Sequence, residues 1–318
     1  MSNSYIAVRE EDYAQSANTL FHFMKKEEYL KDILMNKAIV PRYCIENIGY
    51  LGISDEEIQY EEAAVLQKCF CDIPFHKLTE NFALRGEGDV FESLSEDDRS
   101  KASLNNTHPD FYGGYAIAFS KKWGESHDLQ PIHYLNENSN HTKDFTKLFE
   151  MVLKEEDVSD EYVDDILNRL AFIKPLRGIM NRQFVTKENK SVTIRFWKNF
   201  HDEKEWRYVP SGASLQELGI ERVIANPNVL KTGNTFGNNI LEDINQSLRT
   251  DRCKKLWLEY DYNDIRYIIV PDILSRINII KIIMGIPEEK FSSPQQTELE
   301  KQILISKILV LEEIRKDW

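Results

Sequence analysis

Cysteine is scarce in this sequence, and its spacing indicates no metal site. The chain contains four cysteines, Cys44, Cys253 and the C-x-C pair Cys69 and Cys71. A structural zinc site needs paired Cys or His ligands at short spacings, and the seven histidines are scattered along the chain. We therefore expect reduced thiols and no bound metal.

A long apolar run is also lacking. No window approaches the roughly 18 uncharged apolar residues of a membrane-spanning helix. The N-terminal segment MSNSYIAVREEDYAQS has no basic stretch followed by an apolar one. Both absences predict a cytoplasmic protein that does not contact the membrane.

Positive charge is in deficit as well. The 40 Lys and Arg residues stand against 53 Asp and Glu, which gives a formal net charge of -13 and a pI near 5.1. Phosphate binding requires concentrated Lys and Arg, so a general nucleic-acid surface is not expected. A local basic cleft stays open.

The composition is that of a globular protein. At 318 residues, with 42% hydrophobic and 11% aromatic content, the chain can bury a substantial core. No repeat or low-complexity linker divides it, so we expect one elaborated domain over 1–318. The segment 81–110 is polar without clean periodicity and predicts a mobile surface insertion. The segment 294–318 predicts an amphipathic helix, mainly over Thr297–Lys316.

The order of predicted elements is mixed. Leu20–Met24 predicts a strand, and the segment from Lys26 to Asn36 predicts a helix with apolar residues on one face. The run from Tyr112 to Ser120 has a Gly-Gly entry and an apolar course, which indicates a buried strand that another group approaches closely. Ser191–Trp197 alternates as a further strand. These elements favour an α+β fold.

A segment with two nearby carboxylates is the main candidate for a functional site. In FHDEKEWRYVP, Glu203 and Glu205 are two residues apart in a run suited to a strand, so we expect both to share one face. Two such carboxylates cannot both be desolvated and ionised without compensation. Either the pair is an exposed charged edge strand, or it serves a ligand.

Several motifs resemble known families. The opening LFHFMKKEEYLKDILMNKAIVPRY and the later GGYAIAFS resemble the first two motifs of ADP-ribosyltransferases of the DarT and PARP type. The E-x-E segment resembles their third motif. The runs CFCDIPFHKL, YGGYAIAFSKKWG and FHDEKEWRYVP together resemble the AbiGi family of bacterial abortive-infection proteins, which are described as antitoxins. The resemblance covers roughly Thr19 to Pro210, interrupted by the polar insertion, and extends toward Val270. The transferase resemblance implies an ADP-ribosyltransferase-like split antiparallel sheet with flanking helices.

The transferase resemblance also implies roles for particular residues, with NAD as substrate. Cleavage of the nicotinamide–ribose bond builds positive charge on the ribose, as in glycoside hydrolysis. Glu205 is expected to stabilise that charge, and Glu203 to orient the acceptor or act as a base. The residues expected to contact NAD are His22 at a ribose, Arg42 at the pyrophosphate, Tyr115 or Phe119 at nicotinamide, and Ser120 in the same motif.

Structural alternatives stand beside these roles. His22 lies between two phenylalanines and suits a core position, as do Tyr115 and Phe119. Arg207 could pair with Glu205 and hold that glutamate as a structural anchor. The pattern W-R after the glutamate departs from the usual transferase motif, which leaves activity open more than fold.

Three functions are compatible with the sequence. The first is an NAD-dependent ADP-ribosyltransferase or NAD hydrolase that acts when a phage infects. The second is a catalytically silent antitoxin, whose acidity suits a basic toxin partner. The third is a sensor in which the NAD-like pocket binds a nucleotide signal without cleaving it. The partners that these functions imply are a protein toxin or a phage trigger.

Overall fold

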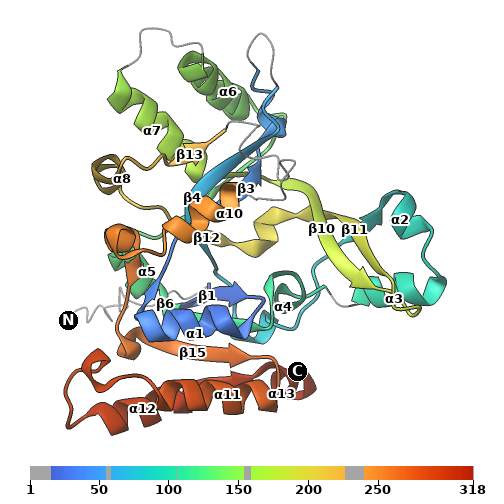
Figure 1. Ribbon diagram of the computed structural model, residues 1–318. Helices are drawn as coiled ribbons and strands as arrows, with labels where there is room; N and C mark the ends of the chain where they lie inside the picture. Colours follow the sequence, from blue (N-terminus) through green and yellow to red (C-terminus); the bar gives the residue numbers. More distant parts are fainter. Residues whose placement is uncertain (1–15, 55–58, 105, 154–158, 226–239, 318) are drawn as a thin grey trace, which may run out of the picture.

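A computed structural model describes residues 16–54, 59–104, 106–153, 159–225 and 240–317 (Figure 1). Its centre is a sheet of nine strands within this part of the chain. The order is β16 (Ile308–Val310), β15 (Ile265–Val270), β6 (Tyr115–Ser120), β1 (Thr19–Met24), β4 (Glu62–Cys71), β12 (Glu205–Tyr208) and β7 (Gln130–Pro131). Strands β3 (Arg42–Asn47) and β13 (Val223–Ile224) also pair with β4. All of these pairings are antiparallel except that of β15 with β16.

The sheet divides along its longest member, β4. The first half of β4 pairs with β3 and β13, whereas its last residues, Lys68 to Cys71, pair with β12. The end of β4 also meets β1, where Phe21 lies opposite Cys71. This near-continuous apolar strand is buried on both faces. The expected antiparallel α+β sheet is therefore confirmed at the level of its architecture.

Helices cover both ends of the sheet. At one end α6 (Asn140–Leu153) and α7 (Asp160–Ala171) lie near β13, with α8 (Gly212–Leu218) beside them (Figure 1). At the other end α11 (Ile273–Met284), α12 (Thr297–Ser306) and α13 (Leu311–Asp317) form an outer layer next to β15 (Figure 1). Helices α1 (Glu27–Asn36), α5 (Lys121–Ser126) and α10 (Ile240–Ser247) lie between these layers. Two small sheets pair β2 (Ala38–Ile39) with β14 (Leu258–Glu259), and β8 (His133–Leu135) with β9 (Ile173–Pro175).

The polar segment 81–110 forms part of a folded lobe. It contributes β5 (Arg85–Glu87), α2 (Gly88–Glu92), α3 (Glu96–Leu104) and the start of α4 (His108–Tyr112). These pack against a long hairpin of β10 (Arg177–Val185) and β11 (Ser191–Asn199). A separate apolar cluster, including Phe111 and Phe196, fills the space between them. The hairpin supplies five of the twelve side chains of this core, which explains why the segment itself shows little periodicity. The segment therefore contains helices and a strand that its sequence pattern does not reveal.

The expected helix over Thr297–Lys316 is interrupted. Helix α12 ends at Ser306, and the next apolar residues form β16, which pairs in parallel with Ile268–Val270 of β15. The chain then resumes as α13. A short run of apolar residues suits a buried strand and a helix equally well. Here the run forms a strand because the edge of β15 offers backbone groups with which it can pair. The single amphipathic helix over 294–318 is therefore a wrong prediction.

The Gly-Gly entry of β6 confirms the close approach that the sequence predicts. Gly113 has φ 116°, and a Cβ there would collide with the backbone of Met24 and Lys25. At Gly114 a Cβ would lie 3.1 Å from the Pro271 side chain. Only glycine adopts this conformation without strain, so the turn into β6 depends on Gly113.

Replacement of Gly113 with Ala should lower the free energy of unfolding by about 2 kcal/mol or more. The cost of the positive φ for alanine and the cost of the steric collision both contribute to this loss. Urea denaturation followed by circular dichroism measures the loss. The control is Gly285→Ala at the end of α11, where φ is -82° and the nearest atom would lie 3.4 Å away. Equal stability of the two variants would contradict the role of Gly113.

Candidate functional site

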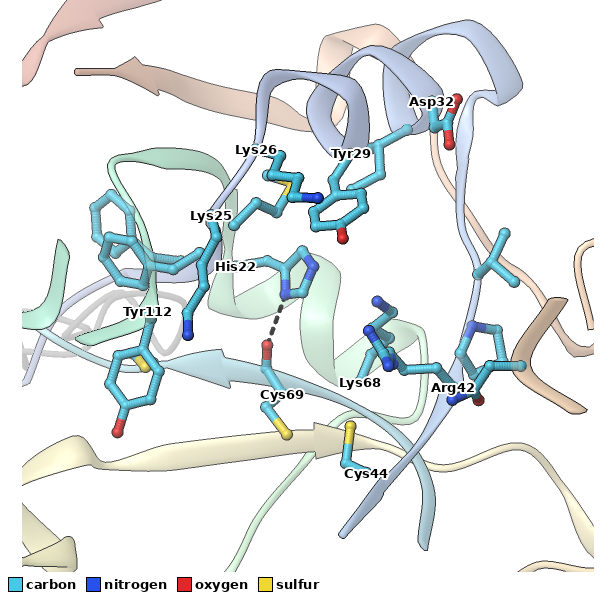
Figure 2. Close-up of a pocket in the computed structure, with 18 of the residues that line it drawn as sticks. His22, Lys25, Lys26, Tyr29, Asp32, Arg42, Cys44, Lys68, Cys69 and Tyr112 are labelled. Atoms are coloured by element: carbon cyan, nitrogen blue, oxygen red, sulfur yellow. Dashed lines mark hydrogen bonds between the residues drawn. The ribbon is translucent and has the colours of Figure 1, made fainter. Parts of the chain in front are cut away.

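A pocket of about 620 Å³ opens where α1, β1, β3, β4 and α10 meet. Figure 2 shows His22 near its centre, with Lys25 on one side and Lys68 and Arg42 on the other. The wall includes four of the seven residues predicted at a ligand, which are His22, Arg42, Glu203 and Glu205. Two aromatic side chains that the sequence analysis did not select, Tyr29 and Tyr112, also line it.

Glu203 is buried at the floor of this pocket, with 2% of its surface exposed. Its Oε1 lies 2.7 Å from Lys198 Nζ and also accepts from the Tyr112 hydroxyl, while its Oε2 lies 2.9 Å from Lys174 Nζ. Burial by itself raises the pKa of this carboxyl. The two ammonium groups outweigh burial and hold the pKa of Glu203 well below its usual range. The carboxylate is therefore ionised.

Glu205 is held in the same way, with 4% of its surface exposed. Its Oε2 lies 2.9 Å from Lys174 Nζ, and its Oε1 accepts from Arg207 Nε at 2.5 Å. Burial raises the pKa of Glu205, but Arg207 and Lys174 together lower the pKa to about 2. The predicted pairing of Arg207 with Glu205 is confirmed.

Arg207 extends this set of contacts. It is fully buried, and its two terminal nitrogens donate to the Ala171 carbonyl at 2.7 Å and to Glu46 Oε1 at 2.9 Å. Six groups therefore alternate in charge through the floor of the pocket. We call this the ion-pair chain, and its members in order are Lys198, Glu203, Lys174, Glu205, Arg207 and Glu46. Its formal charge is zero, which is the condition for burying so many ions.

The local backbone differs from the predicted strand. Phe200–Glu203 is a 3₁₀ turn, Lys204 adopts φ 45°, and β12 begins only at Glu205. Glu203 and Glu205 thus do not share a strand face, although both reach Lys174. Their burial also shows that the alternative of an exposed charged edge strand is wrong.

His22 lines the pocket and has a partner in the protein. Its Nδ1 lies 2.9 Å from the Cys69 carbonyl, which can only accept, so Nδ1 carries the proton. Burial and the nearby Lys68 lower the pKa of His22 to about 3, so the ring is neutral. Its Nε2 therefore offers a hydrogen-bond acceptor (Figure 2).

Tyr115, Phe119 and Ser120 lie away from the pocket wall. Phe119 is fully buried and stacks on Trp123, with ring centroids 4.0 Å apart. The Ser120 hydroxyl caps α5 by accepting from the Trp123 amide at 3.1 Å. The Tyr115 hydroxyl meets Ser275 at 3.0 Å. The middle strand therefore contributes to the core and to helix contacts.

Cations that sequence reasoning missed lie around the pocket. Lys25, Lys26 and Lys68 line it, and none has a carboxylate partner among the described residues. Burial, reinforced by Arg42 and Arg249, lowers the pKa of Lys68 to about 8, although Cys44 opposes this shift. By contrast Arg42 pairs with Glu242 at 3.2 Å, and Arg249 pairs with Asp32. The doublet Lys25-Lys26 directly after the first strand was the available sequence signal.

Other kinds of site are not found in the described part of the chain. Its His, Cys, Asp and Glu side chains form no group of three that could hold a metal ion. None of its helices is long and apolar enough to cross a membrane.

Comparison with known proteins places the chain near one family. Residues 92–271 match the family model described as "Putative abortive phage resistance protein AbiGi, antitoxin". The chain is also 34% identical over 287 residues to "Abortive phage resistance protein AbiGi" of Lactococcus lactis subsp. cremoris. That alignment covers 88% of this chain and all of the relative. No solved structure matches significantly.

Glu205→Gln should lower the free energy of unfolding by about 3–5 kcal/mol, because the substitution leaves Arg207 and Lys174 buried with one negative charge fewer. Urea denaturation at neutral pH measures the effect. Glu188→Gln is the control, because Glu188 is 73% exposed and pairs with the exposed Lys190. This substitution should change the free energy of unfolding by no more than about 0.5 kcal/mol. If both variants were equally stable, the ion-pair chain would not be a structural element.

Proposed function

The chain belongs to the AbiGi family of abortive phage resistance proteins, and we propose that it acts in anti-phage defence by binding a nucleotide in its pocket without cleaving it. NAD is the first candidate ligand, because the motifs around His22 and Glu205 resemble those of ADP-ribosyltransferases. The division of the sheet at β4 is compatible with that fold.

The observation that carries this proposal is the set of pocket cations without carboxylate partners. Lys68 lies on β4 beside His22, while Lys25 and Lys26 lie at the junction of β1 and α1 (Figure 2). Lys68 is half-buried, and a partly desolvated cation without a counter-ion is costly. An anionic ligand such as a pyrophosphate would reduce that cost, and the exposed Lys25 and Lys26 would add two further cations to the contact. The neutral His22 ring adds an acceptor for a ribose hydroxyl, and Tyr29 adds an aromatic ring.

The contacts of Glu205 support binding over cleavage. In a transferase the corresponding carboxylate stabilises a positively charged ribose. Here Arg207 and Lys174 already contact the two carboxylate oxygens, and the Glu205 amide donates to the Tyr134 hydroxyl at 2.7 Å. Lys174 also lines the pocket, and its positive charge would oppose an oxocarbenium ion placed beside it.

Lys68→Met should weaken binding of NAD by about tenfold or more, because the variant loses one charge-assisted contact. Isothermal titration calorimetry with NAD and with ADP-ribose measures the affinity. The control is Lys31→Met, which removes an exposed lysine of α1 that does not line the pocket.

Failure of the wild-type protein to bind either nucleotide would contradict the proposal. Chromatographic detection of nicotinamide from NAD distinguishes cleavage from binding. Release of nicotinamide by the wild type, abolished in a Glu205→Gln variant that stays folded, would establish the transferase or hydrolase reaction instead.

A second candidate function is that of an antitoxin that binds a basic protein partner. The observation in its favour is an apolar face on the outer layer, where Leu274 is 70% and Leu299 59% exposed. Ile273, Ile277 and Met284 of α11 and Ile303 of α12 are also at least 40% exposed. Exposed apolar residues gathered in this way are typical of a protein interface. The net charge of -13 would favour a basic partner, and the family description names an antitoxin.

Leu274→Asp should abolish protection if this face neutralises a toxin, because a carboxylate would be buried in an apolar interface. The measurement is growth of bacteria that express the protein encoded beside this one, with wild-type or variant chain supplied. Val90→Asp on α2 is the control, since Val90 is 44% exposed on a different element. A neighbouring protein that is harmless alone, or full protection by Leu274→Asp, would contradict the antitoxin function.

A further inference from the structure

The outer face of the β10–β11 hairpin differs in character from the rest of this acidic chain. Side chains at alternate positions of β10 and β11 point to solvent, while the intervening ones face the lobe core. The register places Ile179 opposite Trp197, and Asn181 opposite Arg195. Strand β5 continues the same face, because Arg85 lies opposite Trp197. The described residues leave this face uncovered.

Positive charge dominates this face. Its arginines are Arg85, Arg177 and Arg195, and its one carboxylate among the described strand residues is Glu87, which pairs with Arg85 at 2.8 Å. Neither Arg177 nor Arg195 forms an ion pair within the described chain, although Glu87, which pairs with Arg85, lies directly opposite Arg195 in the register. The remaining outward side chains are amides, hydroxyls and three apolar groups, and they include Asn181, Gln183 and Thr193. Three arginines against one carboxylate leave this strand face net positive in a protein of net charge -13.

A hollow lies at the base of the hairpin, where Trp197 is 37% exposed. It has a volume of about 280 Å³, and Trp197, Arg177, Pro175 and Asn138 are among the residues in its wall. Glu137 also lines it. A planar ring placed against the Trp197 indole would therefore have a guanidinium and an amide within the same hollow.

From this combination we propose that the hairpin face binds single-stranded nucleic acid. The Trp197 ring stacks on one base at the hollow, as aromatic platforms do in single-strand binding proteins. Arg177 and Arg195 contact the phosphates that follow along the hairpin, and Asn181 and Gln183 supply hydrogen bonds to base edges. A duplex keeps its bases stacked inside and offers none to Trp197, so the face selects unpaired strands. This site is separate from the nucleotide pocket and does not depend on it.

Fluorescence anisotropy with labelled RNA and DNA oligomers of about ten nucleotides tests the proposal. Trp197→Ala should weaken binding of the single strand about tenfold, whereas Trp197→Phe should retain most of it, because stacking is worth roughly 1–3 kcal/mol per base. Arg177→Gln and Arg195→Gln should each reduce the slope of log affinity against log salt by about 0.7. Lys281→Gln on α11 removes a charge elsewhere and should leave the slope unchanged.

Comparison of RNA with DNA identifies which strand the face prefers, and either preference supports the proposal. Polyglutamate should not compete with the oligomer, because it offers charge without bases. Absence of binding at physiological salt, equal affinity for a duplex, or an unchanged affinity in a folded Trp197→Ala variant would overturn it. NAD titration of the Trp197→Ala protein, with affinity expected to match the wild type, keeps this result independent of the pocket.

Discussion

The ion-pair chain under the pocket is the interaction on which the arrangement of the parts depends. Lys198 comes from the hairpin of the lobe, Lys174 from β9, Glu205 and Arg207 from β12, and Glu46 from β3. Each ion is desolvated and is stable only beside its neighbours of opposite sign. Displacement of any one element would leave a buried charge without a partner. The six groups therefore hold the lobe, the central sheet and the end of α7 in one relative position. Apolar packing among the three separate cores would define that relative position less precisely, because apolar contacts are not directional.

The same chain explains why the pocket remains polar without being acidic. Two glutamates at its floor would repel an anionic ligand if their charges were uncompensated. Lys198 and Arg207 neutralise them from behind, because these two cations do not line the pocket, whereas Lys174 does. The ammonium groups of Lys25, Lys26 and Lys68, which have no carboxylate partner among the described residues, are therefore the cations left for the proposed ligand. The carboxylates position Lys174, so their part in the proposed binding would be indirect.

Sequence reasoning reached the local parts of this site and missed the distant ones. The contact between Glu205 and Arg207 was predictable, because residues two apart on a strand share a face. Lys174 and Lys198 were not, because nothing in a sequence tells which distant lysine will meet a given glutamate. Phe119 shows a different limit. A central strand that packs against a hydrophobic core on each face has an almost continuous apolar sequence. That sequence therefore does not show which of its side chains line a cavity and which, like Phe119, lie in a core. Likewise, the residues of β16 have a periodicity that also suits a helix. They form a strand because they pair with β15, which lies about forty residues earlier in the sequence, and the local pattern does not show that pairing.

The distribution of unpaired cations has a consequence for selectivity. An acidic protein repels anions weakly at long range, since at physiological ionic strength charges are screened beyond about 8 Å. Within that distance, the nearby charged side chains determine whether an anion is attracted or repelled. Lys68 in the pocket and the three arginines of the hairpin face thus each create a local positive field that is screened over the acidic surface between them. An anion that offers only charge would gain little binding free energy at the pocket or at the hairpin face, because each of these sites has few cations. Ligands that add a ring or a hydroxyl to the phosphate would gain contacts with Tyr29 and His22, or with Trp197, at the two proposed sites. Under these proposals, net acidity combined with two small cationic sites would favour nucleotides over simple anions. This preference would follow from the folded arrangement of charges, which the overall composition conceals.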